Sequence, residues 1–196
     1  MKRVAVLISG RGSNLQNLIE AQDASYRIVL VISNIEGAAG LDRASAAGIA
    51  TAVIPHAGKT REAFDAEMDA ALRAADAEIV VLDGFMRILS DGFVRGWEGK
   101  LINIHPSLLP AYRGTRVHER VIAAKEALSG ASVHFVVPEL DAGPVIAQAS
   151  VPVHPSDSPQ TLADRVLAVE HKLYPEALKL LAQDKVTLQN GLAVFG

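Results

Sequence analysis

The stretch Leu101-Ile-Asn-Ile-His-Pro-Ser-Leu-Leu-Pro-Ala-Tyr112 joins a strand pattern to a polar loop. Up to Ile104 the residues are mostly apolar and partly β-branched, which is typical of a buried strand. Asn103 and His105 lie on the same side of that strand, because alternate residues point the same way, and Pro106 then ends it. Open α/β sheets bind ligands at the carboxyl ends of their strands, so Asn103 and His105 are candidate site residues. The alternative is that both side chains only hydrogen-bond the following turn.

The composition indicates one domain with an aliphatic core. The 196 residues suit a single domain, and 49% of them are hydrophobic but only 5% aromatic. The net charge of −3, without a basic run, argues against nucleic acid and against a polybasic membrane anchor. The lack of cysteine excludes disulfides, thiolate zinc sites and cysteine nucleophiles. A strand pattern that begins by Arg3 leaves no room for a signal peptide, and no apolar run is long enough to span a bilayer, so we expect a soluble cytoplasmic protein.

A glycine-rich turn follows the first strand pattern. The apolar run Val4–Ile8 leads into Ser9-Gly-Arg-Gly-Ser-Asn14, and a helical pattern begins at Leu15. Such a strand, turn and helix form a natural anion site, because free N–H groups and the helix dipole point at the ligand. The turn is not a P-loop, and Leu15 replaces the third glycine of the dinucleotide fingerprint. We favour a phosphate monoester over the alternative of a plain turn in which Ser13 or Asn14 caps the helix.

The alternation of strand and helix patterns predicts an α/β fold with an open, mostly parallel twisted sheet and helices on both faces. The expected strands are 4–8, 27–32, 51–54, 78–83 and 101–105, and the expected helices are 15–19, 41–47, 61–75 and 117–128. After Gly130 the alternation changes. Residues 131–137 and 145–153 predict an antiparallel strand pair with an unusually long connection. Ser158 and Pro159 begin a last helix that reaches about Ala182, and 185–188 could form a final edge strand.

Several side chains have both a structural and a functional interpretation. Asp141 could belong to a site, or could bond its own backbone in an Asp-Ala-Gly turn. The run 84–89 could line a ligand pocket, although core packing with Arg87 directed outward is favoured on sequence alone. Glu170 faces the apolar side of the last helix and needs a partner there, whereas His134 alone is typical of a satisfied core or edge histidine. A metal is not expected, because no ligand spacing connects the histidines at 56, 118, 154 and 171.

Five motifs occur in order along nearly the whole chain: Ile8-Ser-Gly-Arg-Gly-Ser-Asn-Leu-Gln16, Gly84-Phe-Met-Arg-Ile-Leu89, Asn103-Ile-His-Pro-Ser-Leu-Leu-Pro110, Ser132-Val-His-Phe135 with Glu139-Leu-Asp-Ala-Gly-Pro144, and Glu170-His171. Together they resemble the phosphoribosylglycinamide formyltransferases, a family of folate-dependent enzymes of purine biosynthesis. The Asn-x-His…Asp set is shared across folate formyltransferases. The Gly12-Ser13-Asn14 loop points to a ribonucleotide acceptor.

The resemblance implies a Rossmann-like formyltransferase domain over 1–196, with a phosphate- and nucleotide-binding half at 1–100 and a catalytic and folate-loop half at 101–196. It implies formyl transfer from 10-formyltetrahydrofolate, a co-substrate used without a metal, to glycinamide ribonucleotide. It also implies small-molecule partners only, and a monomer or weak homodimer. The implied catalytic residues are Asn103, His105 and Asp141. The implied ribonucleotide-binding residues are Gly12, Ser13, Asn14 and Glu170. The implied folate-binding residues are Arg61, Met86, Arg87, Ile88, Leu89, Asn103, Val137 and Asp141.

The chain departs from the family pattern at four places. Asp83 stands where a small residue is usual, Ala142 where a second glycine is common, and Leu167 where some relatives have a basic or amide residue; the 113–118 segment also differs. These departures concern phosphate and loop contacts rather than the reaction.

Two rival functions remain open. The chain could be another formyltransferase domain, acting on methionyl-tRNA or hydrolysing formyl folate, although these enzymes usually carry a further C-terminal or N-terminal domain that we do not expect here. It could also be a nucleotide- or folate-binding module that has lost catalysis. The presence of Asn103, His105 and Asp141 argues against that second alternative.

Overall fold

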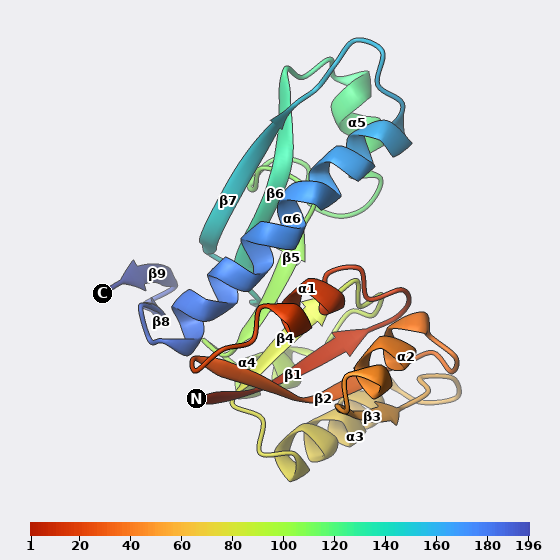
Figure 1. The fold of residues 1–196 in the computed structure, drawn as a ribbon, viewed down its shortest axis with the longest axis vertical. Helices are drawn as coiled ribbons and strands as arrows, with labels where there is room; N and C mark the ends of the chain where they lie inside the picture. Colours follow the sequence, from red (N-terminus) through yellow and green to blue (C-terminus); the bar gives the residue numbers. More distant parts are fainter.

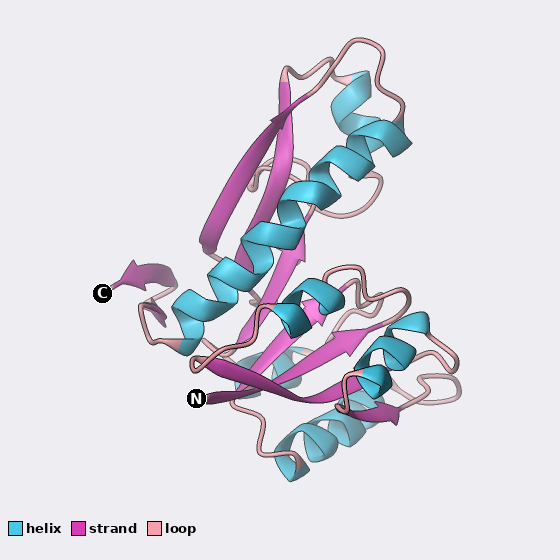
Figure 2. Ribbon diagram, in the orientation of Figure 1, coloured by secondary structure: helices cyan, strands magenta, loops and turns pink.

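The computed structural model describes all residues, 1–196, as one large mixed sheet with helices on both faces (Figures 1 and 2). The strands of this sheet are β1 Lys2–Ile8, β2 Tyr26–Ser33, β3 Ala50–Val53, β4 Ile79–Asp83, β5 Leu101–His105, β6 Leu128–Phe135 and β7 Val145–Pro152. The helices are α1 Leu15–Glu20, α2 Ala39–Ala46, α3 Arg61–Ala74, α4 Asp91–Gly96, α5 Val117–Ala123 and α6 Pro159–Ala182. A separate two-stranded sheet joins β8 Val186–Gln189 to β9 Leu192–Phe195.

The strand order of the large sheet is β3-β2-β1-β4-β5-β6-β7. The first five strands are parallel, whereas β6 pairs antiparallel with both β5 and β7. The chain therefore leaves β1 toward one edge of the sheet, through α1 to β2, and later returns to place β4 on the other side of β1. This reversal creates a crevice at the carboxyl ends of β1 and β4, where open α/β sheets bind ligands. The expected fold class is confirmed.

The apolar core lies in two layers, one on each face of the sheet. The larger layer packs α1, α2, α5 and α6 against one face, and includes Leu15, Val121, Val166 and Tyr174. The smaller layer packs α3 and α4 against the other face. The central strand β4 is buried along its whole length, which explains its continuous apolar run. Figure 1 shows the long α6 lying along β6 and β7 and reaching back to α1.

Helix α6 runs from the β6–β7 part of the sheet to the carboxyl end of β4, where it places the side chain of Glu170. Ser158 caps the helix by accepting the N–H of Thr161, and the reciprocal bond completes a capping box. Tyr174 is fully buried, and its hydroxyl donates to the carbonyl of Leu82. These contacts fix both the start of the helix and its rotation, so that Glu170 faces the crevice.

Two expectations about secondary structure were wrong. The helix expected over 117–128 ends at Ala123, and β6 begins at Leu128 instead of residue 131. The helix stops because Lys125 is left-handed, with φ 54°, and Glu126 donates its N–H back to the carbonyl of Val121. No glycine marks this end, so the sequence pattern gave no signal.

The strand expected at 185–188 exists, but it does not form an edge of the large sheet. It pairs with β9 through the turn Asn190-Gly191, in which both residues have positive φ. Asn-Gly between two short apolar runs is a strong hairpin signal, so the pairing was available from the sequence.

Candidate active site

The glycine-rich turn after β1 lies in the crevice between β1 and β4. A cavity of about 210 Å³ opens there, lined by Ser9, Gly10, Arg11, Gly12, Ser13, Asp83, Gly84 and Met86. Gly12 has φ 59°, and a Cβ at this position would lie 3.2 Å from the Cα of Gly40. Glycine is therefore required both by the backbone conformation and by the close approach of the loop to α2.

Asn14 does not cap α1, contrary to the structural interpretation of this turn. Its side chain makes no capping bond. The first helical N–H, that of Leu15, is donated to Asp83 Oδ2 at 2.9 Å, so a carboxylate from β4 caps the helix. The Asn14 amide instead donates to Glu170 Oε2 at 3.0 Å and, more weakly, toward Asp83 Oδ1 at 3.4 Å. The partner that Glu170 needed is Asn14.

The two carboxyl groups beside Asn14 are buried and hold protons more tightly than usual. Burial raises the pKa of Glu170 to about 7; the Asn14 bond opposes this shift, and the charge of Asp83 reinforces it. Burial also raises the pKa of Asp83, against the opposing effect of the Leu15 N–H bond. The glycine-rich loop and Glu170, far apart in sequence, thus meet at one end of the crevice.

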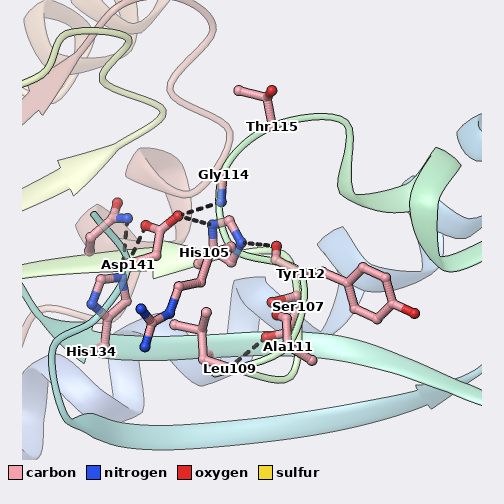
Figure 3. A network of polar contacts seen from close by, with 12 residues as sticks. His105, Ser107, Leu109, Ala111, Tyr112, Gly114, Thr115, His134 and Asp141 are labelled. Carbon is pink, nitrogen blue, oxygen red and sulfur yellow. Dashed lines mark hydrogen bonds and ion pairs between the residues drawn. The ribbon is translucent and has the colours of Figure 1, made fainter. Parts of the chain in front are cut away.

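Of the three residues expected to act together, His105 and Asp141 meet at the carboxyl end of β5 (Figure 3), and Asn103 is linked to Asp141 through His134. His105 Nδ1 lies 3.4 Å from Asp141 Oδ2, and both side chains are only 7% exposed. The other ring nitrogen, Nε2, lies 2.9 Å from the carbonyl of Tyr112, and because a carbonyl only accepts, Nε2 carries a hydrogen. Asp141 Oδ2 also accepts the backbone N–H of Gly114 at 2.9 Å. The interpretation of Asp141 as an acid bonded to its own turn was therefore wrong.

His134 is a fourth member of this cluster, and its role was missed in the sequence. Its Nδ1 donates to its neighbour's carbonyl, that of Phe135, at 2.8 Å, and burial lowers its pKa, so the ring is neutral. Nε2 is then an acceptor, and it lies 3.3 Å from the Asn103 amide nitrogen and 3.8 Å from Asp141 Oδ1. The bond fixes which end of the Asn103 amide carries the nitrogen. His134 stands directly opposite Asn103 in the antiparallel pair β5–β6, a register that the sequence did not reveal.

The segment 84–89 is a surface beside the cavity and not a core element. Met86 and Ile88 are 76% and 63% exposed, so the core-packing interpretation was wrong for both. Leu89 is buried in the smaller core layer, so only its backbone can face a ligand. The N–H of Met86 is held by Ser9 Oγ at 2.8 Å, which attaches this segment to the end of β1. Arg87 is also exposed.

The remaining two residues expected near a folate lie at the borders of this region. Arg61 is exposed in the first turn of α3, and Phe64 of the same helix stacks on Phe85 with ring centroids 6.3 Å apart. Val137 is half-buried just after β6. No group of three or more His, Cys, Asp or Glu side chains is arranged to hold a metal ion, and no helix is long and apolar enough to cross a membrane.

The mixed sheet, its crevice and the Asn-His-Asp cluster at its carboxyl edge match the formyltransferase pattern that the sequence motifs indicate. The chain belongs to the formyl transferase family, whose model matches residues 2–178. Among individual proteins, it is 44% identical to a phosphoribosylglycinamide formyltransferase of Escherichia coli (strain K12), over 97% of this chain and 92% of that protein.

A solved structure and a second relative support the same family. The chain superimposes with a TM-score of 0.94, at 44% identity, on the phosphoribosylglycinamide formyltransferase of Coxiella burnetii, covering 99% of this chain and 93% of that one. It is also 51% identical, over 96% of its length, to the trifunctional purine biosynthetic protein adenosine-3 of Bos taurus. It spans only 19% of that relative's length.

Proposed function

We propose that this chain transfers the formyl group of 10-formyltetrahydrofolate to the amine of glycinamide ribonucleotide, yielding formylglycinamide ribonucleotide and tetrahydrofolate in purine biosynthesis. The family uses a folate-derived formyl donor, and relatives that match nearly end to end are named for this acceptor. The observation that carries the proposal is the His105–Asp141 pair, 3.4 Å apart and at the same sheet edge as the anion loop. The partners are then small molecules, and the chain works in the cytoplasm as a monomer or weak homodimer.

The reaction needs no covalent enzyme intermediate. The acceptor amine attacks the formyl carbon, a C–N bond forms, and the carbonyl oxygen becomes an oxyanion. Collapse of this tetrahedral species breaks the bond to the folate nitrogen, which takes a proton, while the former amine loses one. The site must therefore donate hydrogen bonds to the oxyanion and move one proton. Holding both substrates together contributes the remaining rate enhancement.

Asn103, His105 and Asp141 have different roles in this scheme. Asn103 has one amide N–H bonded to His134 and a second N–H free to donate to the oxyanion. His105 has its Nε2 occupied by the Tyr112 carbonyl, so Nδ1 is the nitrogen that faces Asp141 and the reacting atoms. As an N–H donor, His105 stabilises the oxyanion together with Asn103 and helps to protonate the leaving folate nitrogen. Asp141 holds that ring and accepts the ammonium proton, directly or through water.

The acceptor and the folate occupy different ends of the crevice. Gly12, Ser13 and Asn14 offer backbone N–H groups to the ribonucleotide phosphate, and Glu170 binds the glycinamide-ribose part. The folate lies against residues 86–89, with Arg61 and Val137 at the borders and with Asn103 and Asp141 at its reacting end. In this scheme residues 1–100 do not form the whole ribonucleotide-binding part, because Glu170, from the half at 101–196, completes the acceptor end.

The test is product formation with each alternative acceptor. The protein is incubated with 10-formyltetrahydrofolate and glycinamide ribonucleotide, its dephosphorylated form, methionyl-tRNA, or no acceptor, and products are identified by mass. We expect formylglycinamide ribonucleotide, with a much lower kcat/KM for the dephosphorylated acceptor. Formate release without an acceptor, or equal kcat/KM for both forms of the acceptor, would contradict the proposal.

A further inference from the structure

The backbone of one loop holds both members of the His105–Asp141 pair. This segment, residues 111–116, connects the loop after β5 to α5 (Figure 3). The carbonyl of Tyr112 accepts from His105 Nε2, and the N–H of Gly114 donates to Asp141 Oδ2, at 2.9 Å in each case. Backbone groups two residues apart therefore orient the imidazole and the carboxylate together. The orientation of the pair depends on how this loop is held.

The conformation of this loop is not maintained by helix or strand hydrogen bonding. Residues 111–116 lie outside the helices and strands, and three of them have positive φ: Tyr112 at 55°, Gly114 at 82° and Arg116 at 55°. For residues other than glycine this conformation is unfavourable, and it persists only where the surroundings impose it. The loop therefore needs an external restraint close to Gly114.

Arg120 of α5 supplies that restraint. Its Nη1 donates to the carbonyl of Arg113 at 2.7 Å and to that of Thr115 at 3.3 Å, the two residues on either side of Gly114. Its guanidinium carbon lies 5.3 Å from the centre of the Tyr112 ring, in cation–π geometry. Arg120 thus contacts residues 113 and 115, which adjoin Gly114, and residue 112, whose carbonyl accepts from His105.

The other side-chain attachments of the loop do not act around Gly114. Ser107 Oγ donates to the carbonyl of Ala111 at 2.6 Å, which holds the start of the loop before Tyr112. Arg113 Nη1 pairs with Glu139 at 2.9 Å, and the Tyr112 hydroxyl donates to Glu126 at 2.6 Å. Both are exposed contacts of side-chain ends, which leave the backbone between residues 112 and 115 free to turn. Arg120 acts on the backbone carbonyls themselves, which determines the direction of the Gly114 N–H.

We infer that Arg120 is a positioning residue for formyl transfer: by fixing the carbonyls of Arg113 and Thr115, it directs the Gly114 N–H at Asp141 and the Tyr112 carbonyl at His105. The inference rests on the proposed function. Arg120 touches neither substrate nor reacting atoms, so it acts on the chemical step through the pair and leaves substrate binding almost unchanged.

The test compares Arg120→Ala and Arg120→Lys with Glu119→Gln as a matched control. Glu119 precedes Arg120 in α5 and also contacts the loop, but its exposed pair with Arg116, the last loop residue, joins side-chain ends and not the carbonyls around Gly114. For Arg120→Ala we expect kcat to fall about 10- to 100-fold, because small misplacement of reacting groups costs on this order. KM for both substrates should change less than about twofold. Arg120→Lys keeps a donor but not the planar group, so it should recover part of the loss, and Glu119→Gln should retain the wild-type kcat.

A second measurement does not depend on turnover. In a ¹H–¹⁵N spectrum, the Gly114 amide should move upfield in Arg120→Ala and exchange its hydrogen faster, because its bond to the carboxylate is lost. Arg120→Lys should give an intermediate position, which keeps the test valid if the alanine variant does not fold. An unchanged Gly114 amide, or kcat within twofold of wild type for Arg120→Ala, would overturn the inference. If the wild-type protein fails to transfer formyl but the Gly114 amide moves as expected, the proposed function alone is wrong.

Discussion

At the residue scale, the end of the crevice beside the glycine-rich loop brings two carboxyl groups together in a dry environment. Asp83 and Glu170 are both buried, and the same Asn14 amide nitrogen faces both of them. Two buried carboxylates on one amide cannot both ionise without a large desolvation cost. The raised pKa of both groups expresses this cost. The protein therefore carries at this point a proton that its unfolded chain would release near neutral pH.

Replacing Glu170 by glutamine should remove a pH dependence of stability. The pKa of Glu170 is raised from 4.5 to about 7, so the folded state binds this proton more tightly than the unfolded chain does. Its contribution is therefore fully present below pH 4.5 and is lost as the pH rises through 7, at a cost of roughly 3 kcal/mol. Glu170→Gln keeps the acceptor for Asn14 but cannot ionise.

The measurement is the difference in melting temperature between Glu170→Gln and wild type from pH 5 to pH 8. This difference should grow in favour of the variant as the pH rises. His134 is present in both proteins and cancels in the difference, whereas Asp83 is coupled to Glu170, so the difference reports the Glu170–Asp83 pair. A difference that is constant with pH would show that Glu170 ionises freely in the folded protein.

The residues of the site differed in how well the sequence predicted them. Asn103 and His105 followed from strand alternation and from the proline that ends β5. Asp141 was singled out in its loop as a site or a turn residue, but its pairing with His105 came only through the family motif, because that position depends on how the long β6–β7 connection folds. His134 had no local signal, since its contact with Asn103 arises from an antiparallel register between strands about 30 residues apart.

At the element scale, the β6–β7 connection brings Asp141 to the site by passing very close to β6. A Cβ built on Gly143 would lie 1.7 Å from the carbonyl oxygen of Phe135, far closer than atoms can approach. Phe135 also donates its N–H to the carbonyl of Pro144, which closes the connection. Glycine at 143 is therefore required for space.

We expect Gly143→Ala to lower both stability and turnover. Displacing a packed backbone typically costs about 1–3 kcal/mol, and Asp141 lies two residues away, so kcat per folded molecule should also fall. Gly92→Ala in α4 is the matched control. A Cβ there meets nothing within 4 Å, and alanine in a helix is favoured by up to about 1 kcal/mol, so this variant should melt higher with unchanged kcat. Equal melting temperatures for the two variants would contradict the packing argument.

The elements themselves were largely predictable where hydrophobic periodicity was long and ended by glycine or proline. The long α6 and the buried β1, β4 and β5 are examples. The end of α5 was not predictable because Lys125, a residue with no special preference for it, adopts the left-handed conformation. The pairing of β8 with β9 was not predicted, although the Asn190-Gly191 turn that follows β8 is a hairpin signal.

At the scale of the whole molecule, the sheet brings together segments from both ends of the chain. The loop after β1, segment 84–89 and the end of β5 follow parallel strands at the same edge of the sheet. The β6–β7 connection joins them through the contact of Asp141 with His105, and α6 through the bond of Glu170 with Asn14. Met86 and Ile88 are large apolar side chains that the fold leaves exposed beside the crevice. Large exposed apolar side chains next to a polar site indicate a surface that a ligand covers.

Shortening Ile88 should therefore weaken folate binding selectively. Ile88→Ala removes three apolar carbons at about 0.8 kcal/mol for each one that the ligand buries, so KM for the formyl folate should rise by about fourfold to about 60-fold. KM for glycinamide ribonucleotide and the melting temperature should stay nearly unchanged, because the side chain is exposed in the free protein. Leu128→Ala is the control: Leu128 is 55% exposed at the start of β6, at the end of that strand away from Asn103 and His134. A rise confined to the ribonucleotide KM would mean that the two ends of the crevice are assigned in reverse.

We propose that His105 and Asp141 act as one unit in the transfer step. General acid–base groups contribute roughly 10²- to 10⁴-fold to rate, and residues that act together lose most of their effect with the first removal.

The most direct measurement is a double-mutant cycle of kcat per folded molecule for Asp141→Asn, His105→Asn and the double variant, with ribonucleotide affinity as a control. We predict that each single variant loses about 10²- to 10⁴-fold in kcat while keeping its ribonucleotide affinity, and that the double variant is little worse than the poorer single one. Near-normal kcat for Asp141→Asn, or losses that multiply in the double variant, would contradict the account.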